Sequence, residues 1–215
     1  MALQASLYAT VLATAFTASR IRPLSGRPRR LPWATMVALL VVGLPTLAQF
    51  TVAPWLLADL ERDWGLILRG QIWRLFTSLV VQDGGVPGAL FNLAALAVIG
   101  WAAEEVWGPG RWTVIALSTG LWAQLWGKFV QPVGGGNSVA VFGLAASLAV
   151  LAVQRGVRIQ RLLGLISLLV VAALLVLKDI HGGAATFGAV LAFFLARTDT
   201  MLSARPEPAD GDSRD

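Results

Sequence analysis

Residues 134–156, GGGNSVAVFGLAASLAVLAVQRG, join a polar, glycine-rich opening to an apolar run that ends at Gln154 and Arg155. At 1.5 Å per residue, the run from Ser138 to Gln154 is about 25 Å long, close to the thickness of a bilayer's hydrocarbon core. It therefore predicts a membrane-spanning helix. Polar groups are costly inside hydrocarbon, so three glycines, an asparagine and a serine at its start need a separate explanation.

The composition predicts an integral membrane protein. Hydrophobic residues make up 56% of the 215 residues and charged residues only 13%, far from the balance of soluble domains. There are no cysteines, which excludes thiolate metal sites, and the single histidine excludes a histidine-rich one. We expect no metal and no cofactor. The basic residues behind the net charge of +5 are scattered between apolar segments, so no nucleic-acid partner is expected.

Six apolar runs are long enough to cross a bilayer, which predicts an all-α, polytopic bundle of six transmembrane helices within residues 31–197. The first two runs are joined by residues 59–84, where charges mix with Trp and Leu as in an amphipathic piece at the membrane interface. The six runs are Leu31–Trp55, Val86–Trp107, Arg111–Val130, Ser138–Gln154, Gln160–Leu177 and Asp179–Ala196.

The basic residues predict the orientation of these helices. If the N-terminus is cytoplasmic, twelve of the 17 lysines and arginines fall in inside segments. The remaining five are Arg62, Arg69, Arg74, Lys128 and Lys178. The excess of basic residues in the inside segments favours an N-in, C-in arrangement. The preference for arginine over lysine, with abundant alanine and glycine, indicates a bacterial protein and hence a bacterial plasma membrane.

The two ends of the chain are less apolar. Residues 1–30 are expected to form a cytoplasmic N-terminal segment with a possible amphipathic helix on the membrane surface, although residues 1–19 could instead form an additional span. Residues 198–215 are polar and contain proline, which predicts a disordered cytoplasmic tail.

Ser138 and His181 are polar residues inside predicted membrane helices. Ser138 lies seventeen residues before Arg155, at the cytoplasmic end of its helix. His181 lies sixteen residues before Arg197, at the corresponding end of the last helix. Both side chains are therefore expected at the same depth, roughly 24–26 Å from the cytoplasmic boundary. A packing serine and a histidine bonded to another helix are the simpler interpretations. If the helices touch, the pair forms an activated nucleophile.

The glycines before Ser138 are explained if the loop dips into the membrane. Irregular backbone is tolerated there only where it lines a water-containing cavity, and glycines allow it to turn tightly. Ser138 would then lie in the first helical turn, where unpaired backbone N–H groups face a developing oxyanion. Asn92, twelve residues before Glu104, lies within a few turns of this depth and could add a donor or could bond another helix.

Four separated segments resemble motifs of the rhomboids, six-helix intramembrane serine proteases that use a Ser-His dyad. They are GQIWRLFTSLV at 70–80, FNLAALAVIGWAAEEVWGPGRW at 91–112, GGGNSVAVFGL at 134–144 and HGGAATFG at 181–188. The order of the motifs and the predicted topology agree with that family as well. The resemblance covers roughly residues 70–196.

The resemblance implies that Ser138 is the nucleophile and His181 its base, while Asn92 and the Ser138 backbone N–H bind the oxyanion. It also implies that Phe142 lies under the histidine ring and that Gly136 belongs to the nucleophile motif. The implied substrates are transmembrane segments of other proteins in the lipid bilayer. Structural positions are implied for Trp73, Arg74, Glu104, Ala184 and Gly188.

Two positions depart from the family's pattern. Gly88 replaces a histidine four residues before Asn92, and Val139 replaces the glycine after the nucleophile. Losing one oxyanion donor slows other hydrolases by about 10²- to 10³-fold without removing the nucleophile. We therefore favour an active or weakly active serine-type endopeptidase. The alternatives are a catalytically inactive rhomboid-like protein that binds transmembrane clients, and an unrelated bundle such as a small transporter.

Overall fold

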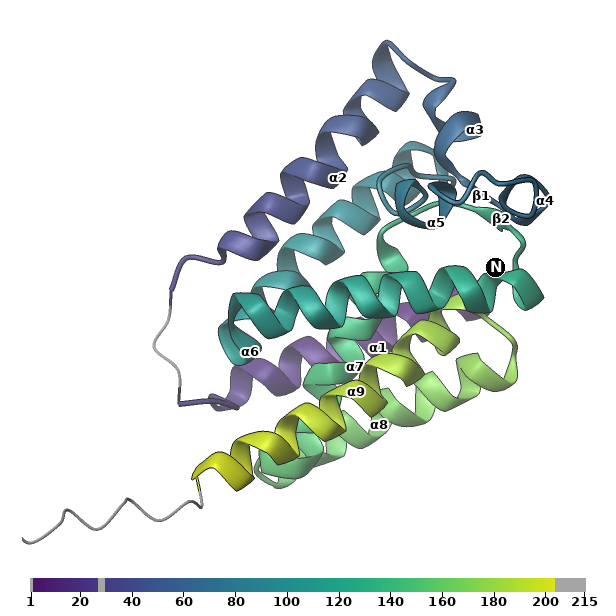
Figure 1. Ribbon diagram of the computed structural model, residues 1–215. Coiled ribbons are helices and arrows are strands. Elements are labelled where there is room, and N and C mark those ends of the chain that lie inside the picture. Colours follow the sequence, from purple (N-terminus) through teal and green to yellow (C-terminus); the bar gives the residue numbers. More distant parts are fainter. Residues whose placement is uncertain (1, 27–29, 204–215) are drawn as a thin grey trace, which may run out of the picture.

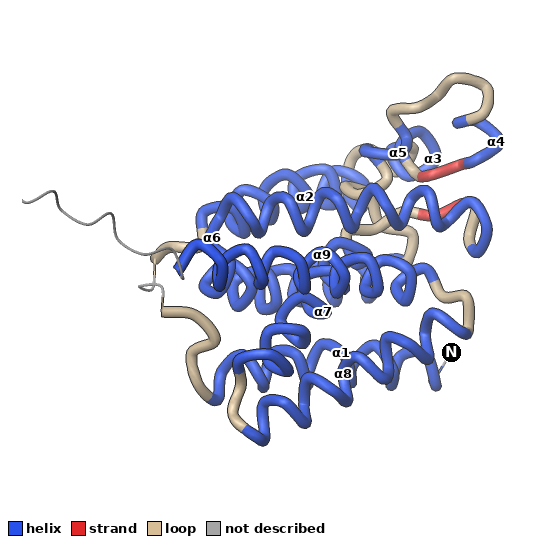
Figure 2. The backbone as a smooth tube through the Cα atoms, turned by 60° about the horizontal axis from the view of Figure 1, so that its bottom comes forward, coloured by secondary structure: helices blue, strands red, loops and turns tan. Residues whose placement is uncertain are grey.

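The computed structural model describes residues 2–26 and 30–203, and this part of the chain is all α apart from one pair of two-residue strands (Figures 1 and 2). Long helices form a bundle, and shorter elements gather at one end of it. The long helices are α1 (Ala2–Ile21), α2 (Trp33–Thr51), α6 (Gly85–Val130), α7 (Ser138–Arg155), α8 (Arg158–Val176) and α9 (Ile180–Ser203). The short elements are α3 (Leu56–Leu60), β1 (Arg62–Asp63), α4 (Trp64–Ile67), α5 (Arg74–Thr77) and β2 (Val133–Gly134).

All six predicted membrane spans are found. Five helices of the described chain are long and apolar enough to cross a membrane, and one of them, α6, has 46 residues. α6 is two helices joined at a kink, because Gly108 has a φ of 74° and Pro109 cannot donate a backbone hydrogen bond. The two halves of α6 therefore provide the second and third predicted spans. The protein is an all-α, multi-pass membrane protein.

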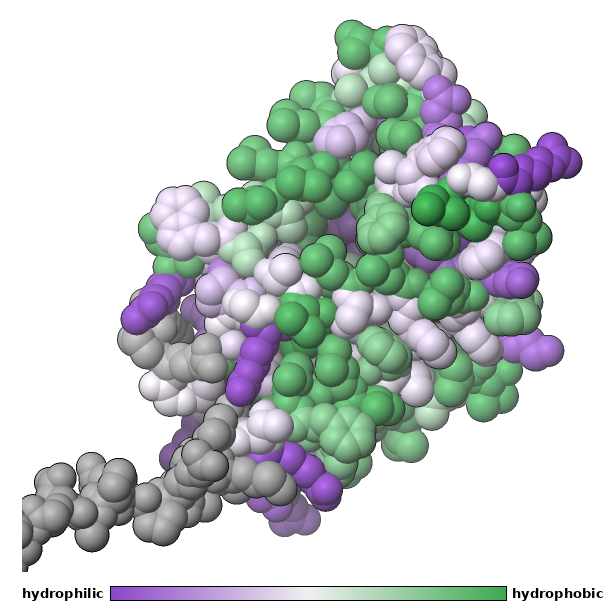
Figure 3. All heavy atoms as spheres, viewed as in Figure 1, coloured by the Kyte–Doolittle hydropathy of each residue, from purple (hydrophilic) through white to green (hydrophobic). Residues whose placement is uncertain are grey.

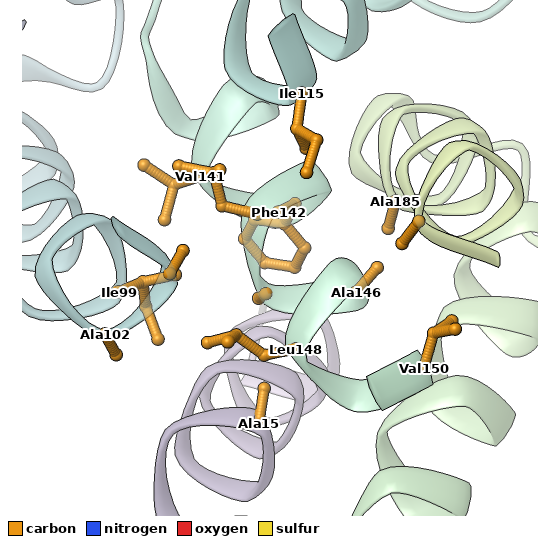
Figure 4. Close-up of a cluster of buried hydrophobic side chains, with 14 of the residues drawn as sticks. Ala15, Ile99, Ala102, Ile115, Val141, Phe142, Ala146, Leu148, Val150 and Ala185 are labelled. Atoms are coloured by element: carbon orange, nitrogen blue, oxygen red, sulfur yellow. The ribbon is translucent and has the colours of Figure 1, made fainter. Parts of the chain in front are cut away.

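α7 lies at the centre of the bundle. It packs against α1, α6, α8 and α9 and is buried along most of its length, as expected for a helix that is apolar on every side. Figure 4 shows Phe142 and Leu148 of α7 between Ile99 of α6 and Ala185 of α9. In the view of Figure 3, hydrophobic atoms cover the middle of the molecule and hydrophilic atoms gather towards its two ends, as a bilayer requires.

α1 corrects the expectation for residues 1–30, because it does not lie on the cytoplasmic surface. It packs along α7 and α8 through the depth of the bundle. Near its beginning, Tyr8 contacts Asp179 at the start of α9; near its end, the carbonyl oxygen of Ala18 accepts a hydrogen bond of 2.7 Å from Gln160 of α8. α1 and α9 therefore run in the same direction. Their first residues lie at one end of the bundle and their last residues at the other.

The hydroxyl groups of α1 explain the difference. Its polar residues argued against a helix packed in the bundle, yet Thr10, Thr14 and Ser19 each donate to a carbonyl oxygen of the preceding turn, at 2.6–2.8 Å. This internal bonding removes most of the cost of burying a hydroxyl. The buried stripe of the helix includes Val11, Leu12, Ala15 and Ala18.

The connection between α2 and α6 is not one amphipathic piece. It is divided into α3, β1, α4 and α5, and β1 pairs with β2 in an antiparallel manner. Arg62 lies opposite Gly134, and Asp63 opposite Val133. The outer loop is therefore bonded to the segment that precedes Ser138.

α9 is longer than predicted. It continues through Ser203, so the expectation of a disordered tail is wrong for residues 198–203. Glycine and proline are absent between Gly188 and Pro206, so nothing in the sequence ends the helix earlier. The rest of the predicted tail, residues 204–215, lies outside the described residues.

Candidate active site

Ser138 and His181 meet where α7 and α9 begin. Ser138 is the first residue of α7 and His181 the second of α9, and Ser138 Oγ lies 2.9 Å from His181 Nε2. Their helices pack against each other more extensively than any other pair in the described chain. A contact of this length lets an imidazole take the hydroxyl proton, as an activated serine requires. We call this end of the bundle the site end.

The loop of residues 134–137 is fastened to the outer connection. Gly136 has a φ of 150°, which favours glycine, and its N–H donates to the carbonyl oxygen of Ser78 at 2.8 Å. The N–H of Gly135 donates to Asp83 Oδ2 at 3.0 Å. The polar stretch is therefore a tied loop that lines a cavity beside the helix start.

Asp179 lies on the other side of the imidazole. Its Oδ1 atom is 2.9 Å from His181 Nδ1 and accepts the His181 backbone N–H at 2.8 Å. Its Oδ2 atom accepts the Tyr8 hydroxyl of α1 at 2.6 Å and the Gln4 amide at 3.4 Å. The sequence interpretation missed both Asp179 and Tyr8 as site residues. The available signal was an aspartate two residues before the histidine at a helix start, where a carboxylate caps the backbone.

Two aromatic rings flank the imidazole. The ring centroids of Phe142 and His181 are 4.6 Å apart, which puts Phe142 where the family resemblance implies it. The ring of Tyr8 lies 4.5 Å from the imidazole and contacts Phe142 edge-on. The imidazole is therefore fixed by contacts with α1, α7 and Asp179.

Asp179 is an anion at neutral pH. Burial opposes its ionisation, but the hydrogen bond and charge of His181 and the hydroxyl of Tyr8 outweigh burial, so the pKa of Asp179 lies below its ordinary value. A buried carboxylate is thus held directly against the imidazole.

Asn92 lies beside Ser138 in a network of side-chain amides. A Cβ atom on Gly136 would lie 3.4 Å from Asn92 Nδ2 and 3.6 Å from Ser138 Oγ, so the three residues surround one small space. Asn92 Nδ2 donates to Gln82 Oε1 at 2.8 Å, and Gln82 Nε2 donates to Asn137 Oδ1 at 3.0 Å. Asn137 Nδ2 in turn donates to the Asn92 carbonyl oxygen at 3.2 Å.

The sequence interpretation missed Gln82 and Asn137, because loop amides follow no periodic pattern. Gln82 is anchored from α2: its backbone N–H donates to Gln49 Oε1 at 2.9 Å, and Gln49 Nε2 donates to its carbonyl oxygen at 2.7 Å. Within the described residues, the backbone N–H groups of Ser138 and Val139 show no acceptor. With Asn92 they form the set of donors available to an oxyanion.

The two positions that depart from the family's pattern differ in their surroundings. A Cβ atom on Gly88 would meet no atom within 4 Å, so this position opens onto free space. The side chain of Val139 is buried against Ala123, Ile180 and Ala184, although Val139 also lines the site cavity. Val139 is therefore a core residue between α6, α7 and α9, as is Ala184.

A cavity of about 50 Å³ opens beside Ser138 and His181. Arg62 and Asp83 are among its lining residues. The Arg62 guanidinium is buried and donates to the carbonyl oxygen of Gln131, at 3.1 and 2.8 Å, from two nitrogens. Burial lowers the pKa of Arg62 to about 10, so it keeps its charge at neutral pH. It ties β1 to the end of α6 and leaves a positive charge near the site.

Trp73 and Arg74 lie in the outer connection, away from the serine. Trp73 is exposed, whereas Arg74 is buried and donates to three oxygens of that connection. Its Nε bonds Gln71 Oε1 at 2.7 Å, and its Nη1 bonds the carbonyl oxygens of Ala58 and Glu61 at 2.9 and 2.8 Å. These contacts brace α3 against α5.

Glu104 lies near the opposite end of the bundle and caps the start of α2. Its carboxylate accepts the backbone N–H groups of Ala34 at 2.9 Å and Thr35 at 2.7 Å, and the Thr35 hydroxyl at 2.8 Å. It therefore joins α6 to α2, in keeping with the structural position that the resemblance implies. A carboxylate suits this position because the unpaired N–H groups of a helix start attract negative charge.

Comparisons with known proteins identify the family of the chain. The chain matches the family model described as Rhomboid domain over residues 69–199. It is 31% identical over 104 residues to "Rhomboid protease GluP" of Bacillus subtilis (strain 168), a match that covers 48% of this chain and 20% of that protein. The chain therefore spans about a fifth of that relative's length. The family match takes in α6 to α9, with Asn92, Ser138 and His181, and the chain belongs to the rhomboid family.

Proposed function

We propose that this protein is an intramembrane serine endopeptidase that cleaves transmembrane segments of other proteins through Ser138 and His181. The observation that carries the proposal is the 2.9 Å contact between Ser138 Oγ and His181 Nε2, in a cavity at one end of a membrane bundle. Membership of the rhomboid family and the protease among the relatives support the same chemistry.

The reaction has two stages. His181 Nε2 takes the hydroxyl proton of Ser138 while Oγ attacks the substrate carbonyl carbon. The tetrahedral intermediate collapses to an acyl-enzyme as the imidazolium returns the proton to the leaving amine. Water then attacks the ester, again with His181 as base, and releases the second product.

The negative charge on the substrate oxygen needs donors that are already in place. The backbone N–H groups of Ser138 and Val139, at the start of α7, and the side-chain amide of Asn92 are the available groups. The helix dipole of α7 adds to their effect because its positive end points at the same place. Gln82 holds the Asn92 amide through a hydrogen bond of 2.8 Å, so its orientation is set before substrate binds.

The site favours an unwound substrate with a small residue at the cut. A peptide bond in an intact helix is shielded by its own hydrogen bonds, so it has to unwind before it reaches Ser138. A small cavity lies beside Ser138 and His181, and the family resemblance implies a small residue at the cut. Substrate unwinding is easiest at the membrane boundary, where water can satisfy the released backbone groups.

We further propose that the site end faces the outside of a bacterial plasma membrane. The charge pattern supports this orientation, because arginines concentrate at the opposite end of the bundle, at the kink of α6 and where α7 ends and α8 begins, and basic residues favour the cytoplasmic side. These arginines are Arg111, Arg155, Arg158, Arg161 and Arg197.

Cleavage of a reporter transmembrane segment by the purified protein in liposomes tests the proposed reaction. We expect wild type to produce two fragments, and Ser138→Ala and His181→Ala to produce none while they retain the wild-type melting temperature. Equal cleavage by wild type and Ser138→Ala would assign the activity to a contaminant and overturn the proposal.

A catalytically inactive rhomboid-like protein that binds transmembrane clients is the second candidate. Gly88 favours it, because this position contributes no side chain to the oxyanion space. Under this alternative, the reporter segment binds wild type and Ser138→Ala equally and stays intact with both. Crosslinking measures binding of the reporter segment, and the fragments formed measure its cleavage. Binding without cleavage would assign the second function.

A further inference from the structure

Both ring nitrogens of His181 have a side-chain partner. A Ser-His dyad requires only the partner at Nε2, so the partner at Nδ1 needs a separate explanation. Ser138 Oγ lies 2.9 Å from Nε2, and Asp179 Oδ1 lies 2.9 Å from Nδ1. The second carboxylate oxygen of Asp179 accepts the Tyr8 hydroxyl at 2.6 Å. Four side chains from α1, α7 and the start of α9 therefore form one continuous hydrogen-bonded chain that ends at the nucleophile.

We propose that Asp179 is a positioning residue that converts the Ser138–His181 pair into a serine triad, and that α1 completes this triad by holding Asp179 through Tyr8. This inference rests on the proposed protease function. It goes beyond that function because it assigns roles in the reaction to a carboxylate and to the first helix of the chain.

The proton balance of the reaction gives Asp179 its role. With Nδ1–H donated to Asp179 Oδ1, the lone pair of Nε2 points at Ser138 and is free to take its proton. The imidazolium that forms is stabilised by the adjacent carboxylate and later gives its Nε2 proton to the leaving amine. No proton moves to Asp179, whose charge is the same before and after each step.

Tyr8 decides where the carboxylate points. It occupies Oδ2, so that Oδ1 stays directed at the imidazole, and its ring packs 4.5 Å from the same imidazole. α1 contributes this side chain from a position 171 residues away in the sequence. The beginning of α1 is therefore part of the active site.

A purely structural role for Asp179 has to be separated from this one. Asp179 Oδ1 also accepts the His181 backbone N–H at 2.8 Å, so the carboxylate caps α9. Asparagine caps helices as well as aspartate does. Asp179→Asn therefore keeps an oxygen for the cap and removes the charge beside the imidazole, while its amide nitrogen replaces the Oδ2 atom that accepts the Tyr8 hydroxyl.

The charged and titratable groups around His181 come from several elements. Asp179 lies two residues before it, just ahead of α9, with the exposed Lys178 one residue earlier, and Tyr8 faces it from α1. Arg62 and Asp83 of the outer connection line the same cavity. Among these titratable groups of the described chain, only Asp179 is bonded to the imidazole and only Tyr8 to Asp179, so substitutions there change the surroundings of the imidazole most directly.

The test compares wild type, Asp179→Asn and Asp63→Asn in liposomes with a cleavable reporter segment. Asp63 is the matched control, because it also caps a helix, α4, through the N–H groups of Gly65 and Leu66. We expect Asp179→Asn to lower kcat at least about tenfold with little change in KM, while its melting temperature stays at the wild-type value. We expect Asp63→Asn to leave both kinetic constants unchanged.

The pH profile and the single histidine provide readouts that a helix cap would not move. A carboxylate beside imidazole stabilises its protonated, inactive form, so the acidic limb of the kcat/KM profile is expected at lower pH in Asp179→Asn. The chain has one histidine, so its imidazole N–H gives a single assignable proton resonance. We expect that resonance further downfield in wild type than in Asp179→Asn, whether or not the protein cleaves substrate.

Tyr8→Phe tests the contribution of α1, because it keeps the ring and removes the hydroxyl bonded to Asp179. We expect kcat to fall by up to about tenfold to hundredfold, the range that one hydrogen bond to a charged group is worth. Thr10→Val, which removes a hydroxyl bonded within α1 to the carbonyl oxygen of Ser6, is the matched control and should keep the wild-type kcat.

The outcomes distinguish this inference from the proposed function. Cleavage by wild type with unchanged kcat, pH profile and N–H resonance in Asp179→Asn would leave a protease with a dyad and overturn the triad. Wild-type kcat in Tyr8→Phe would remove α1 from the active site. A wild type that neither cleaves nor shows the downfield resonance would overturn both conclusions.

Discussion

A Cβ atom added to Gly188 of α9 would lie 2.5 Å from the carbonyl oxygen of Gly143 of α7, so the two helices touch backbone to backbone at these glycines. Gly143 follows Ser138 by five residues, and Gly188 follows His181 by seven. The close approach lies one to two turns below the site on both helices. It therefore sets the separation at which the serine and the histidine meet.

Gly188→Val should separate α7 from α9 and destroy the site. Overpacking of this kind costs about 1–3 kcal/mol, and no nearby side chain can yield because the contact is with backbone. We expect a lower melting temperature and loss of cleavage. Gly110→Ala, where a Cβ meets no atom within 4 Å, is the matched control and should keep both at the wild-type level. An active, stable Gly188→Val variant would show that the glycine contact does not set the site geometry.

Arg74→Ala should lower stability more than activity. Its guanidinium joins α3 to α5 through three hydrogen bonds but lies away from the serine. Removing a buried charged donor is expected to cost about 2 kcal/mol, measured by thermal unfolding. The exposed Arg69 provides the control, and Arg69→Ala should unfold at the wild-type temperature. If activity per folded molecule were lost while stability held, Arg74 would have a role in the reaction instead.

The beginning of α1 and the end of α9 should lie on opposite sides of the membrane. The chain has no cysteine, so Ala5→Cys and Thr198→Cys can be labelled separately with a maleimide that does not cross the membrane. In intact cells we expect labelling at residue 5 only, and in inverted vesicles at residue 198 only. Labelling of both from the same side would contradict the placement of α1 in the bundle.

Gly88→His should raise the rate of substrate cleavage. Gly88 lies one turn before Asn92 on α6, and a side chain there enters open space on the same face. A donor restored to the oxyanion is worth at most about 10²- to 10³-fold in rate. Gly88→Leu, of similar bulk but without a donor, is the control and should give no increase. A folded Gly88→His variant with no gain over Gly88→Leu would show that this position does not reach the oxyanion.

The sequence predicts the spans and the central pair of the site, because both depend on local periodicity and on distance along a helix. Ser138 and His181 lie at matched depth, and the small residues of α7 and α9 allow the contact. Tyr8 could not be predicted in the same way, since its pairing with Asp179 depends on α1 packing against α7 and α8. The sequence of α1 contains several hydroxyl groups, which argued against burial in the bundle. In the structure these groups donate to carbonyl oxygens of the same helix.

Reaction of the detergent-solubilised protein with a fluorophosphonate, followed by mass spectrometry of the labelled peptide, tests the central claim most directly. A serine reacts with this reagent only when a neighbouring base activates it. We expect one adduct, on Ser138, in wild type, and none in folded Ser138→Ala or His181→Ala. Equal labelling of wild type and Ser138→Ala, or a folded wild type that does not react at Ser138, would contradict the assignment of Ser138 and His181 as a catalytic pair.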